Sequence, residues 1–182
     1  LMLKQTQQRV IDQDLLQQFQ LDLTMQQISS AQDCQIVNSC LILKQEEYPS
    51  DKFRERADFH AVIAMKLQNI SQNMFYKAKS LKTVIMPEAE QIASCDQTGG
   101  AFANASVQNC FMPRLKSVGA FGFYDCLLET IDLKSFPQLE TIGDFGFAYC
   151  PIRHLSSNLQ RIGSFGFFGC PLTQTDLPRL KE

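Results

Sequence analysis

Three nearly identical segments follow one another in the C-terminal part of the chain. They read LKSVGAFGFYDCLLETIDL, LETIGDFGFAYCPIRHLSS and LQRIGSFGFFGCPLTQTDL, and together they span residues 115–177. Each contains an aliphatic residue, a glycine, the sequence Phe-Gly-Phe and a cysteine at the same spacing. Self-similarity at a period of about 20 to 50 residues predicts a solenoid, in which each unit buries its apolar face against its neighbours.

The same frame extends along the rest of the chain with decreasing clarity. It fits residues 67–113 if an inserted loop surrounds Thr98-Gly99-Gly100, and it fits residues 1–66 in spacing only. We therefore predict one solenoid domain over residues 1–182, with about eight repeats of roughly 20–26 residues, clear over 67–177 and degenerate over 1–66. The predicted units begin near residues 6, 28, 48, 70, 92, 118, 142 and 162.

The residue types within one unit predict its local structure. Leu128, Ile131 and Leu133 follow a leucine-rich pattern typical of a short strand, with alternate side chains inside the solenoid and parallel neighbours about 4.8 Å away. Gly119 follows an aliphatic residue at the end of a strand, where a tight turn or a close backbone approach favours a residue without Cβ. We expect the Phe-Gly-Phe segment to form one helical or 3₁₀ turn that places its second phenylalanine, such as Phe123, in the core.

The frame Leu-x-x-Ile-Gly-x-x-x-Phe-x-x-Cys followed by Leu-x-x-Ile-x-Leu resembles the BspA-like leucine-rich-repeat family of surface and adhesion proteins. The match is close over 115–177, but Gly122, Gly146 and Gly166 stand where the family usually has alanine, with a phenylalanine before each. The resemblance implies an α/β leucine-rich-repeat solenoid, right-handed and curved, with a parallel β-sheet on one side and short, 3₁₀ or helical turns on the other. It also implies a non-catalytic module for protein–protein interaction or adhesion.

Composition excludes several other classes of protein. With 45% hydrophobic and 20% charged residues among 182, the chain is expected to fold around a buried core. A net charge of −2 argues against a nucleic-acid partner, and the lack of a long apolar run argues against a membrane span in this piece. We expect no signal peptide, because the chain turns polar at Lys4, and we expect a piece of a longer protein, because it opens on Leu1. The compartment stays open, with a surface or secreted location favoured by the resemblance alone.

Cysteines recur once per clear unit, at Cys126, Cys150 and Cys170. Other units have Ala78 and Ala105 at this position, which predicts that the cysteines are small buried apolar residues. Disulfides between neighbouring units are the alternative, although equivalent side chains point the same way and give poor geometry for a bond.

The sequence offers no convincing catalytic or metal site. A nucleophile would need a nearby histidine, and the only histidines, His60 and His154, fall in predicted units about 19 Å apart. Cys34 and Cys40 lack the Cys-x-x-Cys spacing of a zinc site, and Gly99-Gly100 lacks the lysine of a phosphate-binding loop. We therefore predict no enzyme activity, no metal and no cofactor.

The predicted partner site is a stripe on the outer face of the sheet. Ile63, Ile85 and Phe111 occupy outward positions on successive strands, and an exposed apolar patch with a polar rim usually marks a protein contact. Thr83, Asn109 and Asp132 are the predicted rim. The alternative is a register error of one residue, which would turn the stripe inward. The full outward column is predicted as Gln20, Leu41 or Ile42, Ile63, Ile85, Phe111, Asp132, Ser156 and Asp176.

Two further expectations concern self-association and an alternative function. The first predicted unit exposes Leu1, Leu3 and Ile11, and the last stops at Leu180-Lys181-Glu182 without a polar cap, so self-association through the ends is expected. A second functional class is a structural spacer or an intracellular scaffold segment of a longer repeat protein.

Overall fold

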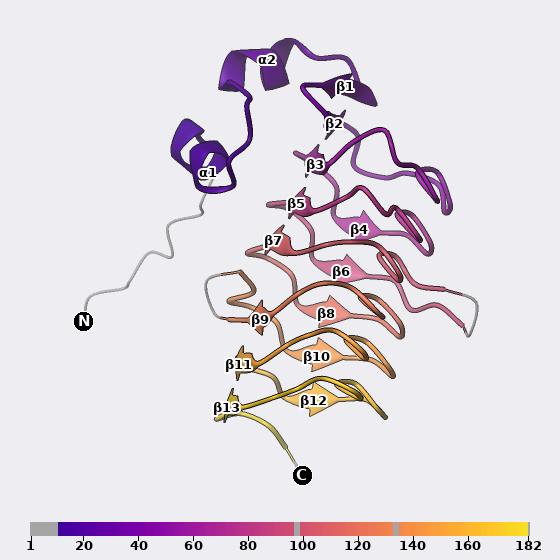
Figure 1. The fold of residues 1–182 in the computed structure, drawn as a ribbon, viewed down its shortest axis with the longest axis vertical. Coiled ribbons are helices and arrows are strands. Elements are labelled where there is room, and N and C mark those ends of the chain that lie inside the picture. Colours follow the sequence, from indigo (N-terminus) through magenta and orange to yellow (C-terminus); the bar gives the residue numbers. More distant parts are fainter. Residues whose placement is uncertain (1–10, 97–98, 133–134, 182) are drawn as a thin grey trace.

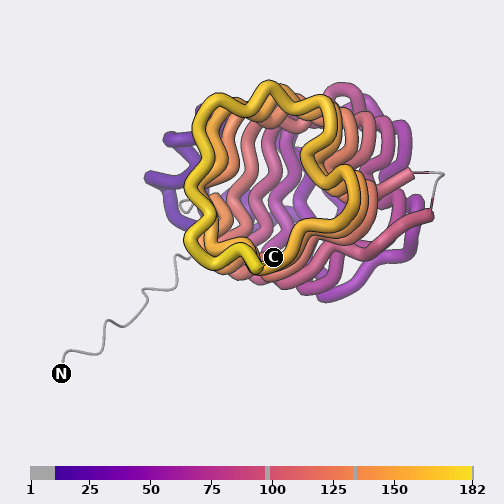
Figure 2. Tube along the Cα trace, turned by 90° about the horizontal axis from the view of Figure 1, so that it is seen from below, coloured from indigo at the N-terminus to yellow at the C-terminus, as the bar shows by residue number. Residues whose placement is uncertain are grey.

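A computed structural model describes residues 11–96, 99–132 and 135–181 as a stack of similar turns with a helical segment at its N-terminal end (Figure 1). Viewed along the stack, the turns superimpose into a flattened ring, and the helices lie outside the ring on one side (Figure 2). Each turn passes through two strand positions, which we call the first and the second strand face. This is the predicted leucine-rich-repeat solenoid, with parallel strands and few helices.

The first strand face carries the longer strands, which pair in parallel in two groups. Strand pairing aligns Ile42 with Ile63, Ile63 with Ile85, and Ile85 with Phe111. The strands of the first group are β2 (Cys40–Leu43), β3 (Ala61–Ala64), β5 (Thr83–Ile85) and β7 (Asn109–Phe111), and those of the second are β9 (Thr130–Ile131), β11 (His154–Ser156) and β13 (Gln174–Asp176). Leu133, expected at the end of a strand, lies outside the described residues.

The second strand face is a further parallel sheet, which the sequence had not predicted. Its two-residue strands are aligned through the aliphatic position of the repeat, so that Val118 pairs with Ile142 and Ile142 with Ile162. Successive backbones come close just after these strands: a Cβ added at Gly119 would lie 2.3 Å from the backbone nitrogen of Ser94. The strands are β4 (Asn69–Ile70), β6 (Gln91–Ile92), β8 (Ser117–Val118), β10 (Thr141–Ile142) and β12 (Arg161–Ile162).

A ladder of stacked phenylalanines runs through the core. Neighbouring rings are 4.9 to 5.7 Å apart between centroids and are stacked nearly parallel, with interplanar angles of 4° to 13°. Parallel stacking of this kind adds about 0.5–1.5 kcal/mol per pair beyond the burial of the rings. The ladder contains one ring per turn: Phe53, Phe75, Phe102, Phe123, Phe147 and Phe167.

The segments around the ladder are stacked hydrogen-bonded turns rather than the predicted helical or 3₁₀ turn. Alternate amides donate to the next turn of the solenoid: Phe121 N to Asp144 O at 2.9 Å, and Phe123 N to Gly146 O at 2.8 Å. In five of the six turns, the residues two before and two after the ladder phenylalanine both adopt left-handed backbone conformations, as at Phe121 (φ 59°) and Asp125 (φ 52°); Gly100 before Phe102 is the exception. These conformations direct alternate amides toward the neighbouring turn, which a helical turn would not do.

The N-terminal part of the chain folds differently from the prediction. Helix α1 (Gln13–Gln18) starts where Asp12 accepts a hydrogen bond from Leu15 N, and α2 (Met25–Ser30) starts at a capping box of Thr24 and Gln27. Strand β1 (Gln35–Val37) then pairs antiparallel with β2. No helix in the described ranges is long and apolar enough to cross a membrane.

The described residues form fewer turns of the solenoid than the eight repeats that we predicted for the whole chain. Residues 11–37 form the two helices and β1, so the unit placed near residue 28 is not a turn of the solenoid. Leu3 and Thr6 at the start of the first predicted unit lie outside the described residues, as do Leu1, and Thr98 of the inserted loop. The solenoid has about six turns, which match the units predicted to begin near residues 48, 70, 92, 118, 142 and 162.

The phenylalanine ladder makes a stability prediction. Phe123 is fully buried and stacks on two neighbouring rings, so Phe123→Ala should lower the free energy of unfolding by about 3–5 kcal/mol. Urea unfolding followed by circular dichroism measures the change. Leu127→Ala, at a side chain that is 44% exposed, is the control and should change stability by no more than about 0.5 kcal/mol. Equal effects of the two substitutions would contradict a core role for the ladder.

Candidate functional site

The predicted stripe lies outside the main core of the solenoid. Ile63, Ile85 and Phe111 belong to a second apolar cluster, separate from the cluster that contains the phenylalanine ladder. Their neighbours along the strands, Val62 and Val84, belong to the main core instead. The three stripe residues therefore occupy the outward side of the first strand face, in one aligned column.

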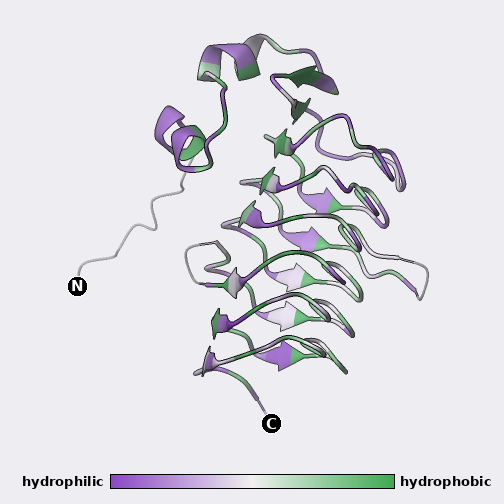
Figure 3. Cartoon of the chain, viewed as in Figure 1, coloured by the Kyte–Doolittle hydropathy of each residue, from purple (hydrophilic) through white to green (hydrophobic). Residues whose placement is uncertain are grey.

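The stripe is nevertheless covered, so the exposure that we predicted for it is wrong. Ile63 and Ile85 have no exposed surface and Phe111 has 3%, because Leu16 and Ile28 of the N-terminal helices pack in the same cluster. Helix α1 lies beside the strands of the first face in Figure 1, and Figure 3 colours β3 hydrophobic and β13 hydrophilic. The apolar part of the outward column thus coincides with the part that the N-terminal segment covers.

The predicted rim is divided between buried and accessible residues. Thr83 is buried, Asn109 is exposed, and Asp132 is partly exposed in the loop after β9, where its Oδ1 accepts a hydrogen bond from Ser135 N at 2.8 Å. The uncovered outward positions are polar, as in the pair His154 Nδ1 and Gln174 Oε1, 2.9 Å apart. The six predicted residues therefore do not form one exposed apolar site.

The predicted position of Gln20 and the predicted exposure of Ile11 also differ from the structure. Gln20 lies in the N-terminal segment just after α1, with a left-handed backbone (φ 55°), and is not on the first strand face. Ile11, expected to be exposed at the N-terminal end, is 3% exposed and packs in the second cluster. Both differences follow from the helical fold of the N-terminal segment.

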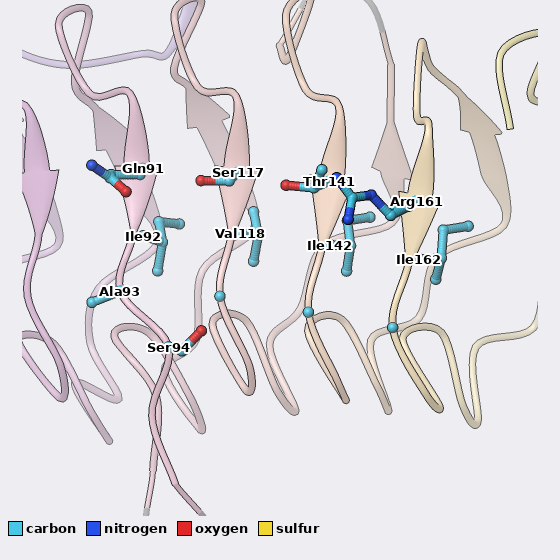
Figure 4. A pocket seen from close by; sticks show the side chains of 13 residues that line it. Gln91, Ile92, Ala93, Ser94, Ser117, Val118, Thr141, Ile142, Arg161 and Ile162 are labelled. Carbon is cyan, nitrogen blue, oxygen red and sulfur yellow. The ribbon is translucent and has the colours of Figure 1, made fainter. Parts of the chain in front are cut away.

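A shallow groove of about 470 Å³ runs along the second strand face (Figure 4). Its floor includes the glycines after the strands, which the sequence predicted to lie at a tight turn or a close backbone approach but not in a groove. The groove crosses β6, β8, β10 and β12, and Arg161 is the only cationic side chain among its lining residues. Representative lining residues are Gln91, Ser117, Gly119, Thr141, Gly143 and Arg161.

Aromatic rings outside the core lie at the turns that follow the second strand face; Phe165 is exposed, whereas Phe121 and Phe145 are half-buried. Phe121, Phe145 and Phe165, the first phenylalanine of each Phe-Gly-Phe, stack at centroid distances of 5.1 Å with interplanar angles of 9° and 19°. This outer stack is separate from the buried ladder, and Phe165 is 60% exposed. The side chains are therefore displayed at the surface rather than used in the core.

A second row of rings lies beside the first. Tyr124, Tyr149 and Phe168 make edge-to-face contacts at 5.4 Å, with interplanar angles of 77° and 88°. Phe168 also contacts Phe165 at 5.7 Å, which joins the two rows, and Tyr149 and Phe168 are each 48% exposed. We call the six rings of the two rows, Phe121, Tyr124, Phe145, Tyr149, Phe165 and Phe168, the aromatic corner.

The outer stack is built at conformationally unfavourable positions. Phe121, Phe145 and Phe165 have φ of 59°, 54° and 58°, whereas the first two turns have Asp51 and Asn73 at the equivalent left-handed position. Aspartate and asparagine tolerate this conformation, but a bulky residue there costs roughly 1–2 kcal/mol. The sequence shows these additional phenylalanines before Gly122, Gly146 and Gly166, and their recurrence at a position that the core does not use could have indicated a role at the surface.

The described residues were also compared with the requirements of metal binding. Among them, no group of three or more histidine, cysteine, aspartate or glutamate side chains is placed to hold a metal ion.

Comparison with known families agrees with the geometry. A model of the BspA type leucine-rich repeat region matches the chain in six copies, over residues 14–97, 46–116 and 90–181. The chain belongs to the BspA-type leucine-rich-repeat family. No curated protein and no solved structure matches it significantly.

The repeated cysteines of this BspA-type protein form a ladder of their own. The thiols of Cys126 and Cys150 donate to the carbonyl oxygens of Phe102 and Phe123 in the preceding turns, each at 3.0 Å. Burial is the main cause that raises the pKa of both thiols, and neither thiol forms a disulfide. The prediction of buried thiols is thus confirmed for Cys126 and Cys150, while Cys170 is half-buried.

The covered stripe predicts the effect of a charge beneath the N-terminal segment. Ile85→Asp should lower the free energy of unfolding by about 3 kcal/mol or more, because an unpaired carboxylate would be buried there. Hydrogen exchange should become faster first in α1 and α2. Ser156→Asp, at the equivalent outward position of β11 but partly exposed, is the control and should leave exchange in the helices unchanged. An unaltered exchange pattern in Ile85→Asp would show that the helices do not depend on the stripe.

The thiol ladder predicts selective reactivity. A raised pKa lowers the fraction of nucleophilic thiolate at neutral pH, so Cys126 and Cys150 should resist alkylation in the folded protein. The half-buried Cys34 and Cys170 should be modified first. Mass spectrometry of alkylated peptides gives the order, with protein in urea as the control in which all seven cysteines react. Early modification of Cys126 would contradict the burial of the ladder.

Proposed function

We propose that this BspA-type repeat protein is a non-catalytic protein-interaction module that binds its partner through the aromatic corner. The family suggests an interaction or adhesion module. Adhesion at a cell surface is the setting that we propose within this class. The aromatic corner is the surface of choice because the stripe on the first strand face is already covered by the chain itself.

The observation that carries this proposal is the outer stack of phenylalanines. Three bulky residues occupy left-handed positions in successive turns, and their rings lie outside the core. The two stacked pairs recover about 1–3 kcal/mol in total, which is less than the roughly 3–6 kcal/mol that three bulky residues in left-handed conformations cost. Since stability gains little from this arrangement, we attribute it to binding, for which exposed aromatic residues are well suited.

The predicted rim on the first strand face remains a second proposed contact surface. Asn109 and Asp132 are accessible at the edge of the covered stripe. A partner that reached Ile63, Ile85 and Phe111 would have to displace α1 and α2. The rest of this face is polar, which favours a structural spacer as the alternative function if no partner depends on the aromatic corner.

Capture experiments test the proposed function. The immobilised protein would be crosslinked to binding proteins in a cell extract, and the triple variant Phe121→Asn, Phe145→Asn, Phe165→Asn would be compared with it. Asparagine suits the left-handed positions, so the variant should stay folded, with stability within about 1 kcal/mol of the parent, yet lose its specific partner.

The matched control is Leu180→Asn, at an apolar side chain that is 44% exposed and not part of the corner. It should retain the captured partner. A folded triple variant that captures the same proteins in the same amounts as the parent would refute the proposed contact surface.

A further inference from the structure

In the first turns of the solenoid, cationic side chains of the chain itself lie over aromatic rings. The Arg54 guanidinium lies over the ring of Tyr76 at 4.8 Å, and Lys77 Nζ lies 5.1 Å from the same ring centroid. Lys52 Nζ lies over Tyr48 at 5.1 Å. Cations within about 6 Å of a ring face are attracted by its quadrupole. At this end of the stack, the chain itself therefore supplies the cations.

Two rings of the aromatic corner, Tyr124 and Phe168, occupy the position of Tyr76 in later turns. Lys77 N donates to Ala103 O at 2.9 Å, and Asn104 N donates to Tyr124 O at 2.7 Å, so the same pattern of bonds leads from Tyr76 through Ala103 to Tyr124. Tyr149 N continues it by donating to Phe168 O at 2.7 Å. Tyr76, Tyr124 and Phe168 thus lie in one column along the solenoid.

The charge of the column changes along the stack. The segments that carry the aromatic corner, residues 119–126, 143–150 and 163–170, contain Asp125 and Asp144 but no lysine or arginine. Both aspartates are exposed, and Asp144 Oδ1 accepts a hydrogen bond from Ser164 N at 2.7 Å. In the described part of the chain, the rings of the corner have no lysine or arginine over them.

Carboxylates and ring faces lie together at the corner, whereas the nearest groove carries a cation. Burial, followed by the effects of Tyr149 and Asp125, raises the pKa of the Tyr124 hydroxyl. The cation of the adjacent groove, Arg161, extends from β12 toward Thr141 on the second strand face (Figure 4). The corner therefore combines ring faces and carboxylates, which are the two groups that bind guanidinium and ammonium ions.

We propose that the aromatic corner binds a lysine- and arginine-rich segment of a partner protein, an inference that rests on the proposed function of this surface. The partner's cations lie over the exposed rings, as Arg54 lies over Tyr76 within this chain, and pair with Asp125 and Asp144. The partner thus supplies the cations for the rings of the C-terminal turns, whereas the chain itself supplies the cations in the first turns.

A defined probe tests the chemistry of the partner. A fluorescent peptide of repeated Arg-Gly-Ser units is titrated with the protein, in parallel with Glu-Gly-Ser and Ala-Gly-Ser peptides. The arginine peptide should bind, the other two should bind at least tenfold more weakly, and added salt should weaken the arginine complex.

Variants assign the binding to the corner. Each lost ring contact should weaken binding about two- to fivefold, so Phe145→Asn with Phe165→Asn should weaken it roughly fivefold or more. Asp125→Asn with Asp144→Asn should weaken binding and reduce its dependence on salt. Leu180→Asn and Asp176→Asn are the matched apolar and acidic controls and should bind as the parent does. Circular dichroism verifies that every variant is folded.

The outcomes separate this inference from the proposed function. If the alanine peptide binds as well as the arginine peptide, or if the corner variants bind the arginine peptide unchanged, the cationic class of partner is wrong. The capture experiment still stands in that case, because it does not depend on the chemistry of the partner. If arginine binding is lost equally in Asp176→Asn, the attraction is a general effect of acidic charge, and the inference is overturned.

Discussion

The close stacking of successive turns is the constraint on which the rest of the structure depends. Parallel strands lie about 4.8 Å apart, and the phenylalanine rings repeat at 4.9 to 5.7 Å, so strands and rings share nearly the same period. A phenylalanine in one turn can therefore stack on its counterpart without disturbing the pairing of the strands. The same closeness requires glycine after β8, β10 and β12, where for example a Cβ at Gly143 would lie 2.6 Å from Ala120 N.

The sequence was sufficient to predict the solenoid from about residue 48 onward, because the ladder positions repeat with the same residue types. At the N-terminus the sequence predicted a degenerate repeat where the structure has a short helix, because the spacing of Leu15, Leu16 and Phe19 fits both. The capping signals of Asp12 and of Thr24 with Gln27 were present and favoured helices. The second strand face was missed because two-residue strands leave almost no alternation to detect.

The candidate site was harder to predict than the fold, for two physical reasons. The apolar outward column was visible in Ile63, Ile85 and Phe111, but whether it is covered depends on packing against α1 and α2, which lie far away in the sequence. The exposure of Phe121 and its equivalents depends on a left-handed backbone that phenylalanine itself disfavours, so residue type gave no indication of it. Local preference and local structure disagree there, as is common at functional positions.

The antiparallel pairing of β1 with β2 makes the β2 end of the first strand face different from the rest of the stack. Every other strand pair of the two faces is parallel, so β1 runs against the direction of the turns and occupies the free backbone groups of β2. Unpaired edges are the places where sheets recruit foreign strands and begin to aggregate. On the first strand face, the β2 edge is thus blocked by a strand whose direction differs from that of the repeat. Another parallel turn therefore cannot pair with β2 on this face.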